Sequence, residues 1–260
     1  MTNAEYHAHS AISKSDLDLI HRSPAHWIYK KNNPNKQTPE MLFGSAVHKM
    51  VLEPETFFDE FVVAPEVDKR TKSGKEEWNS FLEESKGKTV ITNDILIKSK
   101  DIAESISHHV SARQLLTGGC AETSHFWTDE RTGMQCKCRP DYLRSGFCVD
   151  LKTTQNASEE SFQKSAYKYR YYLQAYWYLH GLKQCGIDYA DYFTLIAVEK
   201  EPPYGIATYY VDEDMLQLGK IEADEDLDRI CECMKNNYYS GYPEQLQCLG
   251  LPSWAKKKLI

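Results

Sequence analysis

The feature that most restricts the fold is a group of three short segments in the middle of the chain, joined by tight turns. The segments are Glu122 to Trp127, Met134 to Leu143 and Phe147 to Thr153. Turn residues separate them at Asp129 to Gly133 and again at Ser145-Gly146. Segments of this length and composition, bounded by turn signals, predict a mostly antiparallel β-meander.

The centres of the two turns determine which residues of the meander face each other. If the second turn is centred on its Ser-Gly pair, Asp141 faces Asp150 and Arg139 faces Lys152. If the first turn is centred between Arg131 and Thr132, Glu122 faces Asp141. Because side chains alternate between the two faces of a strand, all five residues then share one face. A slip of one residue in either turn would move one carboxylate to the other face.

Glu122, Asp141 and Asp150 would therefore form a row across three neighbouring strands. Like charges that face each other destabilise a sheet, so the row requires raised carboxyl pKa values or a bound cation. A site made of oxygen ligands suits magnesium or manganese. Lys152 reaches the same site, where it could orient or activate a water or stabilise charge on a phosphate. The alternative, solvent-facing charges on a half-exposed sheet, is weakened because acid faces acid.

Helical patterns and further strands flank the meander. The predicted helices are Ser13 to His21, one that begins at Ser23-Pro24, Pro39 to Leu52, Lys75 to Ser85, about 93–110, about 158–185 and about 212–238. The further predicted strands are Phe61 to Val63, Lys88 to Thr92, Tyr192 to Val198 and Tyr204 to Val211. This order of elements predicts an α/β or α+β fold. The chain shows no internal repeat and no long linker, so we expect residues 1–260 to form a single domain.

Composition limits the choice of partner and compartment. The chain has 31 lysines and arginines against 38 acidic residues, a net charge of −7, so nucleic-acid binding would require local positive charge or bound cations. No apolar run is long enough to span a membrane. The first ten residues lack the apolar core of a signal peptide, so we expect a cytoplasmic protein. The eight cysteines are then expected to be reduced thiols.

An ordered set of motifs runs along nearly the whole chain, with Arg139-Pro140-Asp141 and Asp150-Leu151-Lys152 at its centre. The others are Ser13-Lys14-Ser15, Gly44 to His48, Val51 to Pro54, Ala64 to Glu66, Gly74 to Glu77, Lys88 to Thr92, Ala121-Glu122, Cys136 to Cys138, Gln174 with Tyr178, and Leu251 to Lys256. The set resembles the PD-(D/E)xK nuclease signature. More closely, it resembles the exonuclease VIII (RecE) nuclease domain, a relative of the RecB nuclease domain and lambda exonuclease. The resemblance implies a restriction-endonuclease-like α/β core, in which helices flank a central mixed β-sheet.

The resemblance also implies roles for the residues of the meander. Asp141 and Asp150 would be metal ligands, together with the backbone carbonyl of Leu151. Glu122 would bind or adjust the metals. Lys152 would be the catalytic lysine, which positions or deprotonates the attacking water.

Further roles fall on two predicted helices. His48 would be a ligand, or a neighbouring group, at a second metal, and Gly44 one turn earlier shares its face. Glycine at that position would let another backbone or a phosphate approach closely. Gln174 and Tyr178 would contact DNA near the scissile phosphate, and Arg170 is predicted to share their helical face. That face could instead pack on the sheet.

The activity that the resemblance implies is magnesium-dependent hydrolysis of linear double-stranded DNA from its 5′ ends, with manganese as a substitute. It would leave 3′ single-stranded tails for recombination by strand annealing. The resemblance also implies a homo-oligomeric ring around the DNA, cooperation with a single-strand annealing protein of the RecT type, and a bacterial or prophage origin. Two alternatives are an endonuclease or single-strand nuclease on the same fold, and a DNA-binding assembly module with an inert site.

Other side chains have less specific interpretations. The aromatic residues of Tyr167 to Tyr178 could stack on bases or form core and subunit contacts. The candidate basic contacts with DNA are Arg139, Arg170 with Lys164 and Lys168, the cluster of Lys69, Arg70, Lys72 and Lys75, and Lys256 to Lys258. Each cluster could equally be a solvated face. The two Cys-x-Cys pairs, at 136–138 and 231–233, are expected to be buried or incidental thiols because their spacing is unlike that of zinc sites.

Overall fold

The structure is a computed structural model that describes residues 1–33 and 37–251. The predicted basic tail, Lys256 to Lys258, lies outside the described residues, as does nearly all of the motif from Leu251 to Lys256.

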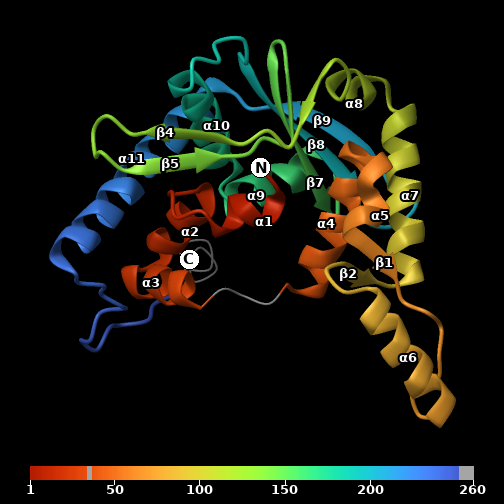
Figure 1. The fold of residues 1–260 in the computed structure, drawn as a ribbon. Helices are drawn as coiled ribbons and strands as arrows, with labels where there is room; N and C mark the ends of the chain where they lie inside the picture. Colours follow the sequence, from red (N-terminus) through yellow and green to blue (C-terminus); the bar gives the residue numbers. More distant parts are fainter. Residues whose placement is uncertain (34–36, 252–260) are drawn as a thin grey trace.

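A five-stranded mixed sheet forms the centre of the molecule (Figure 1). Its strands, in spatial order, are β3 (Gly119–Ala121), β6 (Tyr142–Arg144), β7 (Phe147–Thr154), β8 (Tyr192–Glu199) and β9 (Ile206–Tyr210). The β7–β8 pair is parallel and the other three pairs are antiparallel. The predicted α/β architecture, a central mixed sheet flanked by helices, is thereby confirmed.

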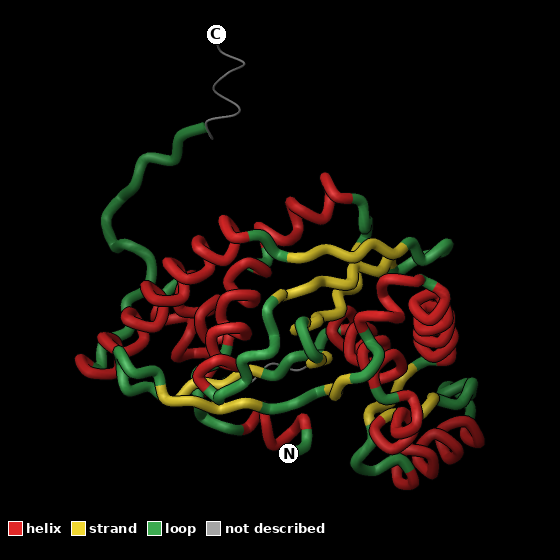
Figure 2. Tube along the Cα trace, turned by 90° about the horizontal axis from the view of Figure 1, so that it is seen from above, coloured by secondary structure: helices red, strands yellow, loops and turns green. Residues whose placement is uncertain are grey.

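Helices cover both faces of this sheet (Figure 2). One face packs against α4 (Pro39–Leu52), α7 (Asn93–His108) and α8 (Val110–Leu115), and the other against α9 (Glu159–Lys168) and α10 (Tyr171–Gln184). Beyond α10 lie α11 (Glu213–Asn236), α2 (Lys14–Arg22) and α3 (Pro24–Asn32).

The alternation of side chains along β7 assigns its residues to the two layers. Val149 and Leu151 pack with α4, α7 and α8, whereas Cys148 packs on the α9 and α10 side. Because successive side chains point to opposite faces of a strand, Asp150 is directed toward α10. This polar residue therefore sits within a strand that is buried on both sides.

Smaller elements complete the fold. They are α1 (Asn3–Ala8), the 3-10 turn η1 (Pro54–Thr56), α5 (Phe57–Glu60), β1 (Phe61–Val63), α6 (Lys72–Glu84), β2 (Thr89–Ile91), β4 (His125–Thr128) and β5 (Gln135–Cys138). Strands β1 and β2 form a parallel pair, and β4 and β5 form a separate antiparallel ribbon. Helix α6 projects from the body of the molecule (Figure 1).

The predicted registers of the meander are confirmed where the strands form. Strands β6 and β7 pair Tyr142 with Val149, and β4 and β5 pair Trp127 with Cys136, as the predicted turn centres require.

The predicted extent of two meander strands is wrong. The segment Met134 to Leu143 divides into β5 and β6, because Pro140 offers no backbone N–H to continue the ladder. The segment Glu122 to Trp127 begins with Glu122 at a φ of 52°, outside any strand, so that β3 ends before it and β4 begins after it. The meander is thus shared between the central sheet and the ribbon.

Two helix predictions also need correction. The predicted helix over 158–185 is two helices, because Arg170 adopts a left-handed conformation with φ 55° between α9 and α10. Helix α1 was not predicted, although Thr2 and Glu5 form the capping box that begins it. Within the described residues, no helix combines the length and the apolar character needed to cross a membrane.

Candidate active site

Three potential metal ligands from different elements meet at one edge of the central sheet. His48 comes from α4, Glu122 follows β3 and Asp141 precedes β6. One ligand atom from each lies within 4.8 Å of the others, and His48 Nδ1 is 3.3 Å from Asp141 Oδ2. The Glu122 N–H donates to the Asp141 carbonyl at 3.0 Å, so these two residues face each other as predicted.

The second aspartate lies beside this group, on β7. Asp150 is only 1% exposed, and its Oδ1 accepts a 2.6 Å hydrogen bond from Gln174 Nε2 of α10. Its Oδ2 lies 2.6 Å from Lys152 Nζ, which in turn lies 4.8 Å above the ring of Tyr171. The Leu151 N–H between them donates to Asp141 Oδ2 at 2.7 Å. The predicted row of carboxylates therefore converges on one place.

The ionisable side chains of the site have pKa values shifted in different directions. Burial alone would lower the pKa of His48, but the Asp141 carboxylate beside it raises that pKa to about 9. Burial would raise the pKa of Asp141, but the His48 imidazolium keeps it below its usual value. Burial, reinforced by the Asp141 charge, raises the pKa of Asp150 and of Glu122. For Lys152, burial opposes the charge and Asp150 favours it, and its pKa is raised.

The donor set fits a hard divalent cation. Three carboxylates and one imidazole are ligands that magnesium and manganese accept. Asp150 Oδ2 is buried, and it accepts no well-directed hydrogen bond from the part of the chain that the structure describes, although Lys152 Nζ is near. A buried carboxylate oxygen with spare acceptor capacity, next to a second carboxylate, is where a cation would relieve repulsion. The backbone carbonyl of Leu151 follows Asp150 directly, as the resemblance requires.

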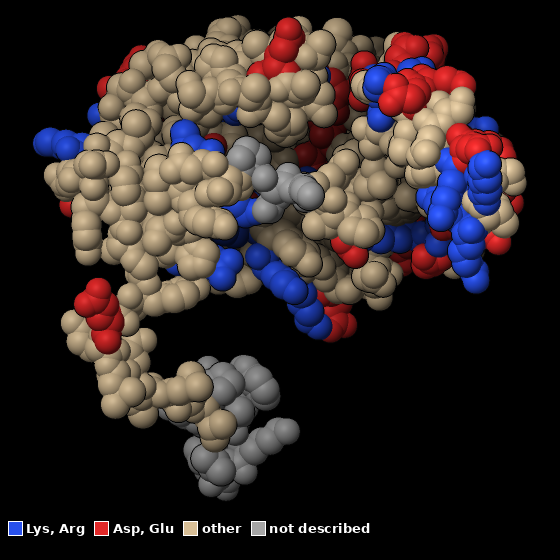
Figure 3. Space-filling model, turned by 60° about the horizontal axis from the view of Figure 1, so that its bottom comes forward, with Lys and Arg blue, Asp and Glu red and all other residues tan. Residues whose placement is uncertain are grey.

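The molecule has a hollowed face, and the helix that carries His48 has an open position. The face in Figure 3 is hollowed near its centre, with acidic side chains deep in the hollow and basic side chains beside it. On α4, a Cβ built at Gly44, one turn before His48, would meet no atom of the described residues within 4 Å. The face that carries His48 is thus open at this position.

Arg139 is tied to the acidic group rather than free. Its Nε donates to Glu122 Oε2 at 2.7 Å and its NH1 to Ser124 Oγ at 2.8 Å. Its guanidinium also lies 5.5 Å from the ring centroid of Tyr6. Helix α1 is held in place by Lys137, whose buried Nζ donates to the Tyr6 carbonyl at 2.6 Å. The sequence did not predict that Tyr6 and Tyr171 lie near the site. The capping box that begins α1 was a signal for the helix that carries Tyr6, and Tyr171 belongs to the aromatic run.

Arg170 does not share a helical face with Gln174 and Tyr178, and that part of the prediction is wrong because the helix breaks at Arg170. Gln174 and Tyr178 both face the central sheet, as the alternative prediction had it. Gln174 is buried and directed at Asp150. Tyr178 is half-buried, with its ring edge-to-face with Phe193 at 5.9 Å. Arg170 is 8% exposed and points away from Asp150, into a group of carboxylates on α2 and α11. Contact of these residues with DNA stays a prediction.

The remaining candidates lie mostly outside the site. Lys69, Arg70 and Lys72 are exposed near the start of α6, and Lys164 and Lys168 are exposed on α9. All eight cysteines are free thiols, and those of the pair in β5, Cys136 and Cys138, are buried, as expected for incidental thiols. Burial raises the pKa of Cys136 to about 12.

Comparisons with known proteins agree with this geometry. The family model for a "PDDEXK-like domain of unknown function (DUF3799)" matches residues 13–252. The chain belongs to this PDDEXK-like family. It is also similar in fold to a crystal structure described as a "Putative exonuclease" from Eubacterium rectale, with a TM-score of 0.65 and 14% identity over 100% of this chain and 99% of that one.

Two further comparisons add no argument. A second solved structure, SSO0001, has a TM-score of 0.36 and 13% identity, covering 86% of this chain and 80% of its own. No curated protein matches the chain.

The family and the fold together support a nuclease of the PDDEXK-like superfamily, whose members typically depend on divalent metals.

Proposed function

We propose that this protein is a magnesium-dependent exodeoxyribonuclease that degrades linear double-stranded DNA in the 5′ to 3′ direction. The coarser part of the proposal, a metal-dependent nuclease, is supported by the family match and by the donor set of the site. The finer part, the direction of degradation and the 3′ single-stranded product, is supported by the resemblance of the sequence motifs to the RecE nuclease domain.

The observation that carries the proposal is the convergence of four acidic or imidazole ligands and one lysine from five places in the chain. His48, Glu122 and Asp141 offer ligand atoms within 4.8 Å of one another, and Asp150 lies beside them with Lys152 as its ion-pair partner. Each carboxylate has a cationic neighbour, since His48 lies beside Asp141, Arg139 beside Glu122 and Lys152 beside Asp150. Burial, reinforced by the Asp141 charge, still raises the pKa of Glu122 and of Asp150. A bound cation would stabilise the charged form of these two carboxylates.

The roles of the residues follow from the contacts. His48, Glu122, Asp141, Asp150 and the Leu151 carbonyl would hold magnesium, which when bound neutralises phosphoryl charge and lowers the pKa of water. Lys152, held by Asp150, would place its ammonium against a phosphoryl oxygen or orient the attacking water. Gln174 would fix the orientation of Asp150 through its 2.6 Å hydrogen bond. The open face at Gly44 would admit the sugar–phosphate backbone.

The proposed partners follow from the same resemblance. We expect the protein to act at the ends of double-stranded DNA, to assemble as a homo-oligomeric ring, and to deliver the resulting single strand to an annealing protein of the RecT type. Manganese should substitute for magnesium, because both are hard cations that accept oxygen ligands.

The test compares two lysine variants on linear duplex DNA with magnesium. Lys152→Gln should lower the cleavage rate by at least about 100-fold, the scale of a proton-transfer or charge-stabilising group. Lys183→Gln, an exposed position on α10, should cleave like the wild type. EDTA should abolish cleavage in both the wild type and the control. Wild-type protein that binds DNA but does not cleave it, with either magnesium or manganese, would favour the inert-module alternative.

A further inference from the structure

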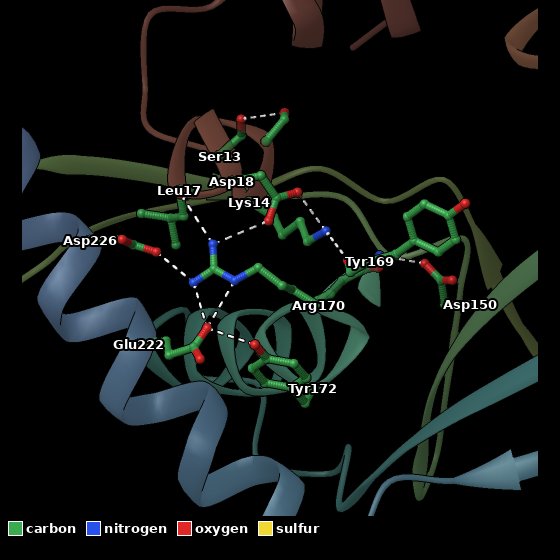
Figure 4. A network of polar contacts seen from close by, with 12 residues as sticks. Ser13, Lys14, Leu17, Asp18, Asp150, Tyr169, Arg170, Tyr172, Glu222 and Asp226 are labelled. Carbon is green, nitrogen blue, oxygen red and sulfur yellow. Dashed lines mark hydrogen bonds and ion pairs between the residues drawn. The ribbon is translucent and has the colours of Figure 1, made fainter. Parts of the chain in front are cut away.

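The junction between α9 and α10 is held by a buried arginine. Arg170 is 8% exposed, and its Nε donates to Glu222 Oε2 at 2.9 Å, while NH2 donates to Asp226 Oδ2 at 2.6 Å (Figure 4). Its NH1 donates to the carbonyl of Leu17 at 3.2 Å and to Asp18 Oδ1 at 3.4 Å. One guanidinium therefore ties the start of α10 to both α2 and α11.

The backbone of this arginine is in a costly conformation. Arg170 has φ 55° and ψ 45°, the left-handed region that costs a side-chain-bearing residue about 1–2 kcal/mol. The sequence offers no glycine or proline nearby to explain the break, since residues 159–180 contain neither. Such a conformation persists when the surrounding contacts determine it. Here those contacts are the ion pairs of the guanidinium with Asp18, Glu222 and Asp226.

The break decides where the next turn of helix points. The Arg170 carbonyl accepts the N–H of Gln174 at 3.2 Å, so the same residue begins the hydrogen-bond ladder of α10. Within this first turn, the Tyr171 ring lies beneath Lys152 Nζ and the Gln174 side chain reaches Asp150 Oδ1. The neighbouring Tyr172 turns the other way, and its hydroxyl donates to Glu222 Oε2 at 2.7 Å. The first turn of α10 thus contacts the site through Tyr171 and Gln174 and the anchoring network through Tyr172.

We propose that Arg170 is a positioning residue: its guanidinium holds the break between α9 and α10 and thereby aims Gln174 at Asp150. The role rests on the proposed function, in which Asp150 is a metal ligand. Arg170 does not touch the site, so it acts only through Gln174 and Tyr171. Groups that orient a metal ligand are commonly worth about 10- to 100-fold in activity or metal affinity.

The test uses Arg170→Lys, which keeps the charge opposite Asp226 but cannot engage Glu222 and Asp226 together. Glu222→Gln is a milder second variant, because it leaves the guanidinium and Asp226 intact. The matched control is Arg131→Lys. Arg131 also binds two aspartates of α11, Asp224 and Asp228, but these lie on a different side of the helix, because each is two positions from Glu222 or Asp226.

The first readout is the side-chain amide signal of Gln174 in a 1H–15N spectrum, assigned with Gln174→Ala. We expect Arg170→Lys and Glu222→Gln to shift this signal toward that of a solvated amide, and Arg131→Lys to leave it in place. This measurement requires no cleavage, so it tests the positioning role even if the wild type proves inactive. An unchanged Gln174 signal in folded Arg170→Lys, or an equal shift in the control, would overturn the proposal.

The second readout is the rate of cleavage of linear duplex DNA. Arg170→Lys should lower kcat by about tenfold or more, with a smaller change in KM. Combined with Gln174→Ala, it should add little further loss, because residues that act through one contact are not additive. Fully additive losses would show that Arg170 does not act through Gln174.

Discussion

Gly44 offers a prediction in which stability and activity should change in opposite directions. It lies in the interior of α4, one turn before His48, and a Cβ at this position would meet no atom within 4 Å in residues 1–33 and 37–251. Glycine in a helix interior is less favourable than alanine by about 0.8–1 kcal/mol. Gly44→Ala should therefore raise the free energy of unfolding by about that amount, because no neighbour in the described part of the chain opposes the new methyl group.

For a chain of this size, the gain corresponds to a rise in Tm of about 2–4 °C. If the open face admits the DNA backbone, the same methyl group stands where a phosphate must approach. Displacing a reacting group by about 1 Å can cost up to about 100-fold, so cleavage should fall by about ten- to a hundredfold. Thermal unfolding and initial rates on linear duplex DNA measure the two effects separately.

The matched control is Ser45→Ala, at the neighbouring exposed position. It removes a hydroxyl that donates to the Met41 carbonyl at 2.9 Å, but it adds nothing to the His48 face. The control should retain its activity. A Gly44→Ala protein that is stabilised and fully active would refute the inference that substrate occupies this face. A destabilised Gly44→Ala protein would contradict the open space around Gly44.

Three other predictions follow from the packing and the site. Gly219→Ala should lower the free energy of unfolding by about 1–3 kcal/mol in thermal melts, because its Cβ would lie 2.4 Å from the Tyr172 carbonyl oxygen; an unchanged Tm would contradict this close contact of α10 and α11. Manganese at about 100 times its Kd should stabilise the wild type by about 2.7 kcal/mol relative to EDTA, and Asp141→Asn should lose most of this gain; equal gains in both proteins would argue against the proposed ligands. Native protein should react rapidly with a thiol reagent at Cys120 and Cys248, which are exposed, whereas the buried thiols react only after unfolding; rapid labelling of all eight would contradict the burial.

The convergence of acidic residues could be predicted because it depends on local rules. Turn centres fix strand register, and the alternation of side chains then brings Glu122, Asp141 and Asp150 together. The registers hold even though the meander is divided between two sheets. Pro140 signalled that division, since it cannot donate to a ladder, but only the packing of the ribbon on α10 shows where β4 and β5 go.

The break at Arg170 could not be predicted from local sequence. No turn residue marks it, and its causes are carboxylates on α2 and α11, far away in the sequence. The same long-range pairing explains why an arginine beside the Gln-x-x-x-Tyr motif is directed away from Asp150. His48 required the motif resemblance, because a single histidine on a helix carries no local sign that Asp141 lies 3.3 Å away.

The most direct test of a metal-dependent exonuclease is a time course with magnesium on end-labelled linear duplex DNA and on covalently closed circular duplex DNA. We expect the linear DNA to be lost from its 5′ ends, with mononucleotides as product, while the circle stays intact. Cleavage of the circle would contradict the exonuclease assignment and place the protein among endonucleases. If neither substrate is cut, the site does not hydrolyse DNA.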